Sequence, residues 1–310
     1  MRNGPQRWRT RLFRLLPAVA VAIMALEVFG HFWAADPLVI SDLVQRTNDA
    51  LAFRGRPGAK VDYAGVLVRL PPVRVELNSL GFRDDEPLPG DRRPQILVLG
   101  DSNTFGLGVR QDRTFPALLK KRLPADNVLN LAVPGYNFAQ EAGLFRTMPP
   151  SYALTVFVLF DNDFSPIVGL HERPPCFGVL RHLALYRLYF IWRYVARIED
   201  DESAARRGYG RALELLHDLK SFPRPIWFLM LHRPPFKITE FERQVRQDFR
   251  WLDCEDIYRQ HNFPADKHLD EAGHRLVAER LYAAIVDAGL QGGPEARELR
   301  SAGTRPPDRR

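Results

Sequence analysis

Cysteine is almost absent from this sequence: its 310 residues include only two, Cys176 and Cys254. Two cysteines cannot build a disulfide-stapled scaffold, and neither has the spacing of a metal ligand. We expect both to be buried or incidental thiols, with a single disulfide between them as the alternative. The sequence therefore predicts no metal site, and it contains no motif for a bound cofactor.

The sequence also lacks the patterns of nucleic-acid-binding proteins, although its formal net charge is +7. It has no internal repeat, no helix-turn-helix pattern and no stripe of basic and aromatic residues. Much of the positive charge lies instead near the two ends of the chain, at Arg2, Arg7, Arg9, Arg11, Arg14, Arg297, Arg300, Arg305, Arg309 and Arg310. We therefore expect no nucleic-acid partner. The hydrophobic share of 45% excludes global disorder.

One long hydrophobic run is present, at residues 15–35. At ~1.5 Å per residue, such a run just spans a bilayer core. Because five arginines precede it, we expect residues 1–14 to be a cytoplasmic basic tail and the rest of the chain to lie across the membrane. A cleaved signal peptide is the alternative, but Trp33-Ala34-Ala35 places a bulky residue at the first small position of a cleavage site. We expect an uncleaved anchor, in which Glu27 is the costliest residue.

Strand and helix patterns alternate from about residue 93 to residue 290. Strands are predicted at 96–99, 128–133, 154–160, 226–231 and 249–252, and helices at 114–123, near Gln140 and Leu144, and at 270–288. This order predicts an α/β domain in three layers, with a central parallel sheet between helices. A helical insertion is expected at about 178–221. Residues 36–92 form a lead segment with two short edge strands that meet at Pro71-Pro72, and the tail at 291–310 is expected to be disordered.

Small and polar residues follow three of the predicted parallel strands, at 100–103, 134–137 and 161–163. Because parallel strands end at the same edge of a sheet, these clusters meet there. Ser102 supplies a hydroxyl, and its neighbours supply backbone and side-chain amides, which are the parts needed for acyl transfer. Asp266 and His268, just before the last helix, supply a base and a carboxylate that orients it. The order Ser, Asp, His is that of α/β hydrolases.

These blocks resemble those of the SGNH (GDSL-type) hydrolases. Gly100-Asp101-Ser102-Asn103 is similar to the first block, Asn130 to Gly135 to the second, Asn162-Asp163 to the third, and His268 with Gly273 to the last. The resemblance implies a flavodoxin-like fold, a catalytic triad of Ser102, His268 and Asp266, and an oxyanion hole made by Ser102, Gly135 and Asn162. The chain departs from the family at Phe160, where glycine is common, and at Ala265, where the aspartate is usual.

The resemblance to membrane-anchored bacterial members implies an inner-membrane protein with a periplasmic catalytic domain. Because Asn78 to Arg83 also resembles a segment of such proteins, we expect an esterase that removes acyl groups, chiefly O-acetyl groups, from carbohydrate or an envelope polymer. An O-acetyltransferase with the same triad and a silent glycan-binding module are the alternatives. Arg83 is expected to pair with a carboxylate, and Asp163 to hold the oxyanion loop. The insertion around Leu185, Tyr189 and Trp192 either shields an acyl chain or packs on the sheet.

Overall fold

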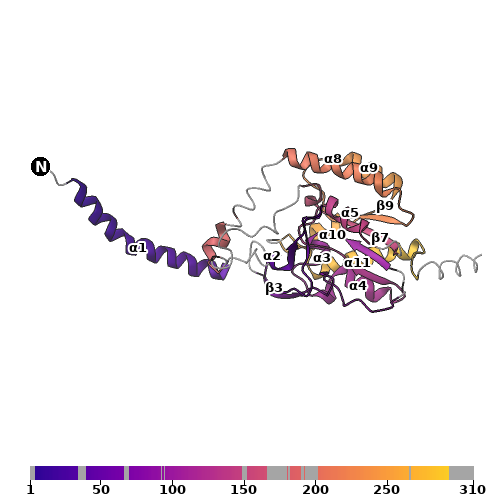
Figure 1. The fold of residues 1–310 in the computed structure, drawn as a ribbon, viewed down its shortest axis with the longest axis horizontal. Coiled ribbons are helices and arrows are strands. Elements are labelled where there is room, and N and C mark those ends of the chain that lie inside the picture. Colours follow the sequence, from indigo (N-terminus) through magenta and orange to yellow (C-terminus); the bar gives the residue numbers. More distant parts are fainter. Residues whose placement is uncertain are drawn as a thin grey trace, which may run out of the picture.

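The structure, a computed structural model, describes residues 4–33, 40–65, 70–91, 93, 95–148, 152–165, 180, 182–189, 192, 202–264 and 267–292. For residues 4–14 and 202–205 it describes the backbone alone. A long N-terminal helix extends away from an α/β body (Figure 1). Of the two cysteines, Cys176 lies outside the described residues, so the alternative of a disulfide between them stays untested. Cys254 is a buried free thiol whose pKa burial raises to about 12.

The body is built on a five-stranded parallel sheet in the order β6-β5-β7-β8-β9. Its strands are β5 (Gln95–Leu99), β6 (Asn127–Asn130), β7 (Tyr152–Leu159), β8 (Ile226–Met230) and β9 (Arg250–Asp253). All four pairings are parallel. Counted along the sheet, this is the 2-1-3-4-5 order of flavodoxin-like proteins, whose ligand crevice lies where the order reverses, between the first and third strands. Here that point lies between β5 and β7.

Helices cover both faces of the sheet, as the alternating pattern predicts. Those of the body are α4 (Phe115–Arg122), α5 (Phe138–Arg146), α8 (Glu202–Leu219), α9 (Thr239–Asp248), α10 (Glu255–Gln260) and α11 (Glu271–Asp287). Successive β5 side chains point to opposite faces: Leu97 and Leu99 pack with residues of α5, α8 and α9, and Ile96 and Val98 pack with residues of α4, α10 and α11. The predicted three-layer arrangement is therefore confirmed. β7, at the centre of the sheet, is buried along its whole length.

The structure refines several predicted boundaries. β6 ends at Asn130, three residues earlier than predicted, although the N–H groups of Leu131 and Val133 still donate to the carbonyls of Val98 and Gly100. The helices α9 and α10 were not predicted. Within the expected insertion, α8 packs Leu215, Leu216 and Leu219 into the core beside the sheet. α8 is thus one of the covering helices of the sheet.

The lead segment forms two small antiparallel sheets outside the central one. A short helix, α2 (Ile40–Leu43), precedes β1 (Val44–Arg46), which pairs with β2 (Phe53–Gly55), and β3 (Lys60–Tyr63) pairs with β4 (Val73–Glu76). β4 begins just after the two prolines as expected, but its partner is the upstream β3. Residues 66–69, where the other strand of the proline turn was predicted, lie outside the described residues. The lead segment contributes Phe53, Tyr63 and Val75 to the main core.

The N-terminal helix α1 (Gly4–Trp33) contains the predicted apolar run. Its segment Leu15–Phe32 has a mean hydropathy of 1.9 and is long and apolar enough to cross a membrane, a test that signal sequences also pass. Large apolar side chains of this segment are exposed, from Leu15 to Phe32. The tail expected at 291–310 lies outside the described residues beyond Gly292.

Candidate active site

Ser102 lies at the first turn after β5, at the sheet edge where the strand order reverses. It begins the short helix α3 (Ser102–Phe105), and Asp101 caps that helix by accepting the N–H of Asn103 at 2.9 Å. Ser102 is partly exposed, whereas Asp101 and Asn103 on either side are buried. The turn therefore presents the serine hydroxyl at the carboxyl end of a central strand while its neighbours hold the backbone in place.

His268 lies directly against Ser102, although 166 residues separate them in the chain. Its Nε2 is 2.9 Å from the Ser102 Oγ. The imidazole is 8% exposed, and the edge of the Tyr63 ring from the lead segment packs against it at a centroid distance of 6.3 Å. The 2.9 Å distance between His268 Nε2 and Ser102 Oγ is within hydrogen-bond reach for a base that removes the serine proton.

The loop that carries His268 is fastened at several points. The N–H of Leu269 donates to Asn103 Oδ1 at 3.0 Å, which ties the loop to the residue next to Ser102. The Tyr258 hydroxyl donates to the carbonyl of Lys267 at 2.9 Å, and the His268 carbonyl accepts the N–H of Phe263 at 2.8 Å. The contacts fix the position of the imidazole relative to the hydroxyl. Asp266, predicted as its orienting carboxylate, lies outside the described residues.

Gly135 and Asn162 follow the two strands that flank β5. Val133 to Tyr136 form a turn closed by the Tyr136 N–H and the Val133 carbonyl, in which Pro134 is followed by Gly135 at φ +82°. This is the arrangement of a type II turn, which requires a positive φ at its third residue. Asn162 lies in the short 3₁₀ helix η3 (Asp161–Phe164) after β7. Because β6, β5 and β7 are neighbours, the structure brings both residues to the edge that carries Ser102.

Three buried carboxyl groups, those of Asp101, Asp163 and Glu141, lie behind this edge. Each is at most 3% exposed. Burial is the largest cause that raises the pKa of all three, and the charges of neighbouring carboxylates raise these pKa values further. Hydrogen bonding from the Asn162 side chain lowers the pKa of Asp101, so the amide reaches the carboxylate next to Ser102.

Asp163 and Glu141 form a pair that links η3 to α5. The Asp163 carboxylate accepts the N–H of Phe160 at the end of β7, which agrees with the expectation that Asp163 holds this loop. The interaction between the two side chains raises the pKa of Glu141 and lowers that of Asp163. Burial and the charge of Asp163 thus favour the neutral form of Glu141. Asn137 at the start of α5 donates to the Ser165 carbonyl at 2.9 Å and joins the same two elements.

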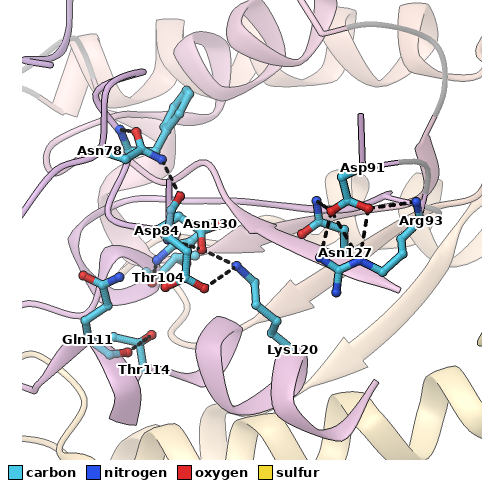
Figure 2. Close-up of polar contacts among 12 residues, drawn as sticks. Asn78, Asp84, Asp91, Arg93, Thr104, Gln111, Thr114, Lys120, Asn127 and Asn130 are labelled. Atoms are coloured by element: carbon cyan, nitrogen blue, oxygen red, sulfur yellow. Dashed lines mark hydrogen bonds and ion pairs between the residues drawn. The ribbon is translucent and has the colours of Figure 1, made fainter. Parts of the chain in front are cut away.

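Among the described residues, Arg83 pairs with no carboxylate, contrary to expectation. It is buried, and its guanidinium donates to the backbone carbonyls of Phe105, at the end of α3, and of Gly106 and Val109 in the loop that follows. Burial lowers its pKa to about 10. The carboxylate beside it, Asp84, binds Lys120 of α4 instead and accepts the N–H of Asn130 at 2.9 Å (Figure 2). The 78–84 segment thus supports the nucleophile loop and the end of β6 from outside the sheet.

Comparison with known proteins gives structural matches alone. No family model matches the sequence, and no curated protein matches it. The chain is similar to GDSL-type structures. It matches TesA with a TM-score of 0.40 at 18% identity, covering 62% of this chain and 97% of that one. It matches a lipolytic G-D-S-L family member from Veillonella parvula with a TM-score of 0.37 at 14% identity, covering 62% and 98%. A salicylyl-acyltransferase, SsfX3, matches with a TM-score of 0.37 at 16% identity, covering 66% and 58%.

A cavity of about 1110 Å³ lies to one side of Ser102 and His268. Asp84, Arg110, Lys120, Phe263 and Glu271 are among its lining residues, and Ser102, His268, Gly135 and Asn162 are not. Its charged groups are largely paired with one another, as in the contacts of Asp84 with Lys120 and of Arg110 with Asp112. The cavity is therefore separate from the reactive hydroxyl. Within the part of the chain that the structure describes, no cluster of His, Cys, Asp and Glu is arranged to hold a metal ion.

Two residues of the site were missed from the sequence. Asn103 belongs to the first sequence block, but its role in tying down the His268 loop depends on a contact across 166 residues. Glu141 had a local signal, because it shares the apolar stripe of α5 with Phe138, Ala142 and Phe145. A carboxyl group in a core-facing stripe needs a partner, and that partner is Asp163. His274, the other histidine near the start of α11, is buried, stacks on Phe115 and accepts the N–H of that residue, and burial lowers its pKa to about 3.

Proposed function

We propose that this chain is an SGNH-type serine esterase that hydrolyses short acyl esters. The observation that carries the proposal is the 2.9 Å contact between Ser102 Oγ and His268 Nε2 at the reversal point of the sheet. A hydroxyl and an imidazole at that distance form the nucleophile and base of acyl transfer.

In the first half of the reaction, His268 Nε2 takes the proton of Ser102 as Oγ attacks the ester carbonyl. The carbonyl oxygen becomes an oxyanion, and the backbone N–H groups of Ser102 and Gly135 and the side-chain amide of Asn162 donate to it. The tetrahedral intermediate then loses the alcohol, which takes the proton from His268, and the acyl group remains on Ser102. Asp266 orients the imidazole and stabilises its cationic form.

In the second half, His268 accepts a proton from water as the water oxygen attacks the acyl-enzyme. The same three donors stabilise the second oxyanion, and its collapse returns the proton to Ser102 Oγ and releases the acid. A sugar hydroxyl in place of water would give acyl transfer through identical steps. The proposed substrate is an acyl ester, chiefly an O-acetyl ester, of carbohydrate or of an envelope polymer.

The proposal includes the setting of the enzyme. The apolar segment Leu15–Phe32 of α1 holds the chain in the bacterial inner membrane, and the arginine-rich tail before it faces the cytoplasm. The catalytic body then lies in the periplasm. An exported enzyme fixed to the membrane reaches esters of surface polymers, which supports an envelope substrate.

The test compares Ser102→Ala with Ser221→Ala, whose serine lies on the exposed turn after α8. Turnover of acyl esters of two to twelve carbons is measured for the purified full chain, together with labelling by a fluorophosphonate. Ser102→Ala is expected to lose labelling and roughly 10⁵–10⁶-fold in kcat, while Ser221→Ala keeps both. Retained turnover in Ser102→Ala would overturn the assignment. Asn162→Ala is expected to lose about 10²–10³-fold in kcat.

Product analysis separates the candidate functions. A preference for two-carbon esters with release of free acid identifies an acetyl esterase, and a preference for long chains identifies a lipase. Transfer to an added glycan with little release to water identifies an O-acetyltransferase. A chain that neither turns over esters nor reacts with the fluorophosphonate would instead be a silent binding module.

A further inference from the structure

A short helix at residues 184–189 lies against the C-terminal part of α1 rather than against the sheet. Figure 1 shows it as the salmon ribbon beside the end of α1, outside the body. The carboxylate of Glu27 in α1 accepts the N–H of Ala184 and that of Leu185, the latter at 3.0 Å. The two helices also approach closely at Gly30, where a Cβ would lie 2.7 Å from the Ala184 Cβ. Neither predicted role of this segment, as an acyl shield or as packing on the sheet, matches this position.

The segment carries large apolar side chains that the described part of the chain leaves uncovered. Leu183 and Leu188 are 44% and 43% exposed, and Tyr189 and Trp192 are 50% and 66% exposed. The Tyr189 and Trp192 rings lie 6.1 Å apart. An exposed apolar cluster of this kind marks an interaction surface. Tyrosine and tryptophan are the side chains that favour the boundary between lipid headgroups and acyl chains, because one end of each is apolar and the other polar.

The position of Glu27 fixes the depth of this contact. It lies five residues before Phe32, where the apolar segment of α1 ends, so it is about 7.5 Å inside that end at 1.5 Å per residue. Interfacial helices bury their apolar face about 5–10 Å into the same boundary. A carboxylate at this depth needs polar partners. The two backbone N–H groups at the start of the short helix and His31 Nδ1, 3.5 Å away, provide them.

We infer that residues 183–189 and Trp192 form an interfacial element that lies in the headgroup boundary of the bilayer that holds α1. The inference rests on the membrane anchor of the proposed function. The lipid is the occupant because the exposed cluster continues the exposed apolar surface of α1 and lies at the level where that surface leaves the bilayer. The element holds the catalytic body close to the membrane, so substrates anchored in or lying on that surface are the ones within its reach.

The inference is tested by the depth of fluorescent labels in the full chain, reconstituted in vesicles of phosphatidylcholine and phosphatidylglycerol. Cys176 is replaced by serine and the buried Cys254 is kept, and one accessible cysteine at a time is introduced as Leu188→Cys, Val21→Cys or Glu240→Cys and labelled with an environment-sensitive dye. Quenching is measured with lipids that carry a spin label near the headgroup or near the chain end. Glu240, on α9 of the catalytic body, is the control for a residue in water.

The Leu188→Cys label is expected to be quenched most strongly by the shallow spin label, the Val21→Cys label by the deep one, and the Glu240→Cys label by neither. If the Leu188→Cys label behaves like that at residue 240 while residue 21 is deep, the interfacial element is refuted and the anchor stands. If residue 21 is not quenched, the anchor fails and the inference fails with it. Glu27→Leu, which removes both acceptor oxygens, is expected to reduce shallow quenching at residue 188, and Glu27→Gln to reduce it less.

Discussion

Replacing Glu141 by glutamine removes one ionisable proton from the buried pair behind the candidate oxyanion loop and leaves its shape almost unchanged. The Glu141 side chain lies between α5 and η3 and faces Asp163 and Asp101. Neither of its carboxyl oxygens has a hydrogen-bond partner among the described residues. Glutamine fills nearly the same volume, and it carries no ionisable proton. The substitution therefore changes the titration of the pair more than its packing.

The magnitude follows from proton linkage. Burial, the largest cause, and the charges of Asp163 and Asp101 raise the pKa of Glu141 well above its ordinary value of 4.5. At pH values above 4.5, Glu141 releases its proton in the unfolded chain but keeps it in the folded chain. The free energy of unfolding therefore falls as pH rises, by up to about 1.4 kcal/mol per pH unit, until the folded pKa is passed and the loss levels off. The Glu141→Gln variant lacks this proton in both the folded and the unfolded state. As pH rises, its free energy of unfolding should therefore fall less steeply than that of the wild type, by up to about 1.4 kcal/mol per pH unit.

Urea denaturation of the wild type and of Glu141→Gln from mildly acidic to mildly alkaline pH measures this difference. Glu214→Gln is the matched control, because the Glu214 side chain is exposed on α8 and pairs only with Arg211 among the described contacts. The curve for Glu214→Gln is expected to parallel the wild type, whereas that for Glu141→Gln is flatter toward alkaline pH. Parallel curves for Glu141→Gln and the wild type would show that Glu141 is ionised in the folded protein and would refute the reasoning.

Three further substitutions test the supports of the site. Asn103→Ala leaves the N–H of Leu269 unpaired, which should cost about 1–3 kcal/mol of stability. The substitution should also lower kcat more than it raises KM. An unchanged kcat would show that His268 does not need this hydrogen bond. Arg83→Met removes the donor to three carbonyls of the nucleophile loop and should cost on the order of 3 kcal/mol, measured by thermal denaturation against the exposed control Arg110→Met; equal losses in the two would contradict it. Gly135→Ala places a Cβ on a residue at φ +82°. It should lower the free energy of unfolding by about 1–2 kcal/mol and also lower kcat. A neutral result would mean that the turn relaxes freely.

The alternation of apolar strands and amphipathic helices was sufficient to predict the fold. Ile96 to Leu99 and Leu154 to Leu159 are runs that only a buried strand accommodates, and the residues that end them are small or polar. The pattern was weaker where strands are short. β1, β2 and β3, of three or four residues each, and the partner of β4 depend on pairings between distant segments that no local pattern encodes.

The sequence by itself determined which candidate reactive groups meet, since a hydroxyl, an imidazole and amide donors each lie next to a predicted element in an order that the sheet brings to one edge. Tertiary structure alone decided how these groups are held. The tie from Asn103 to the His268 loop, the burial of Glu141 against Asp163 and the guanidinium of Arg83 on the nucleophile loop all join residues far apart in the chain. The same holds for the short helix that meets Glu27. Hydrogen bonds and burial of this kind depend on distances in space, and sequence spacing does not record them.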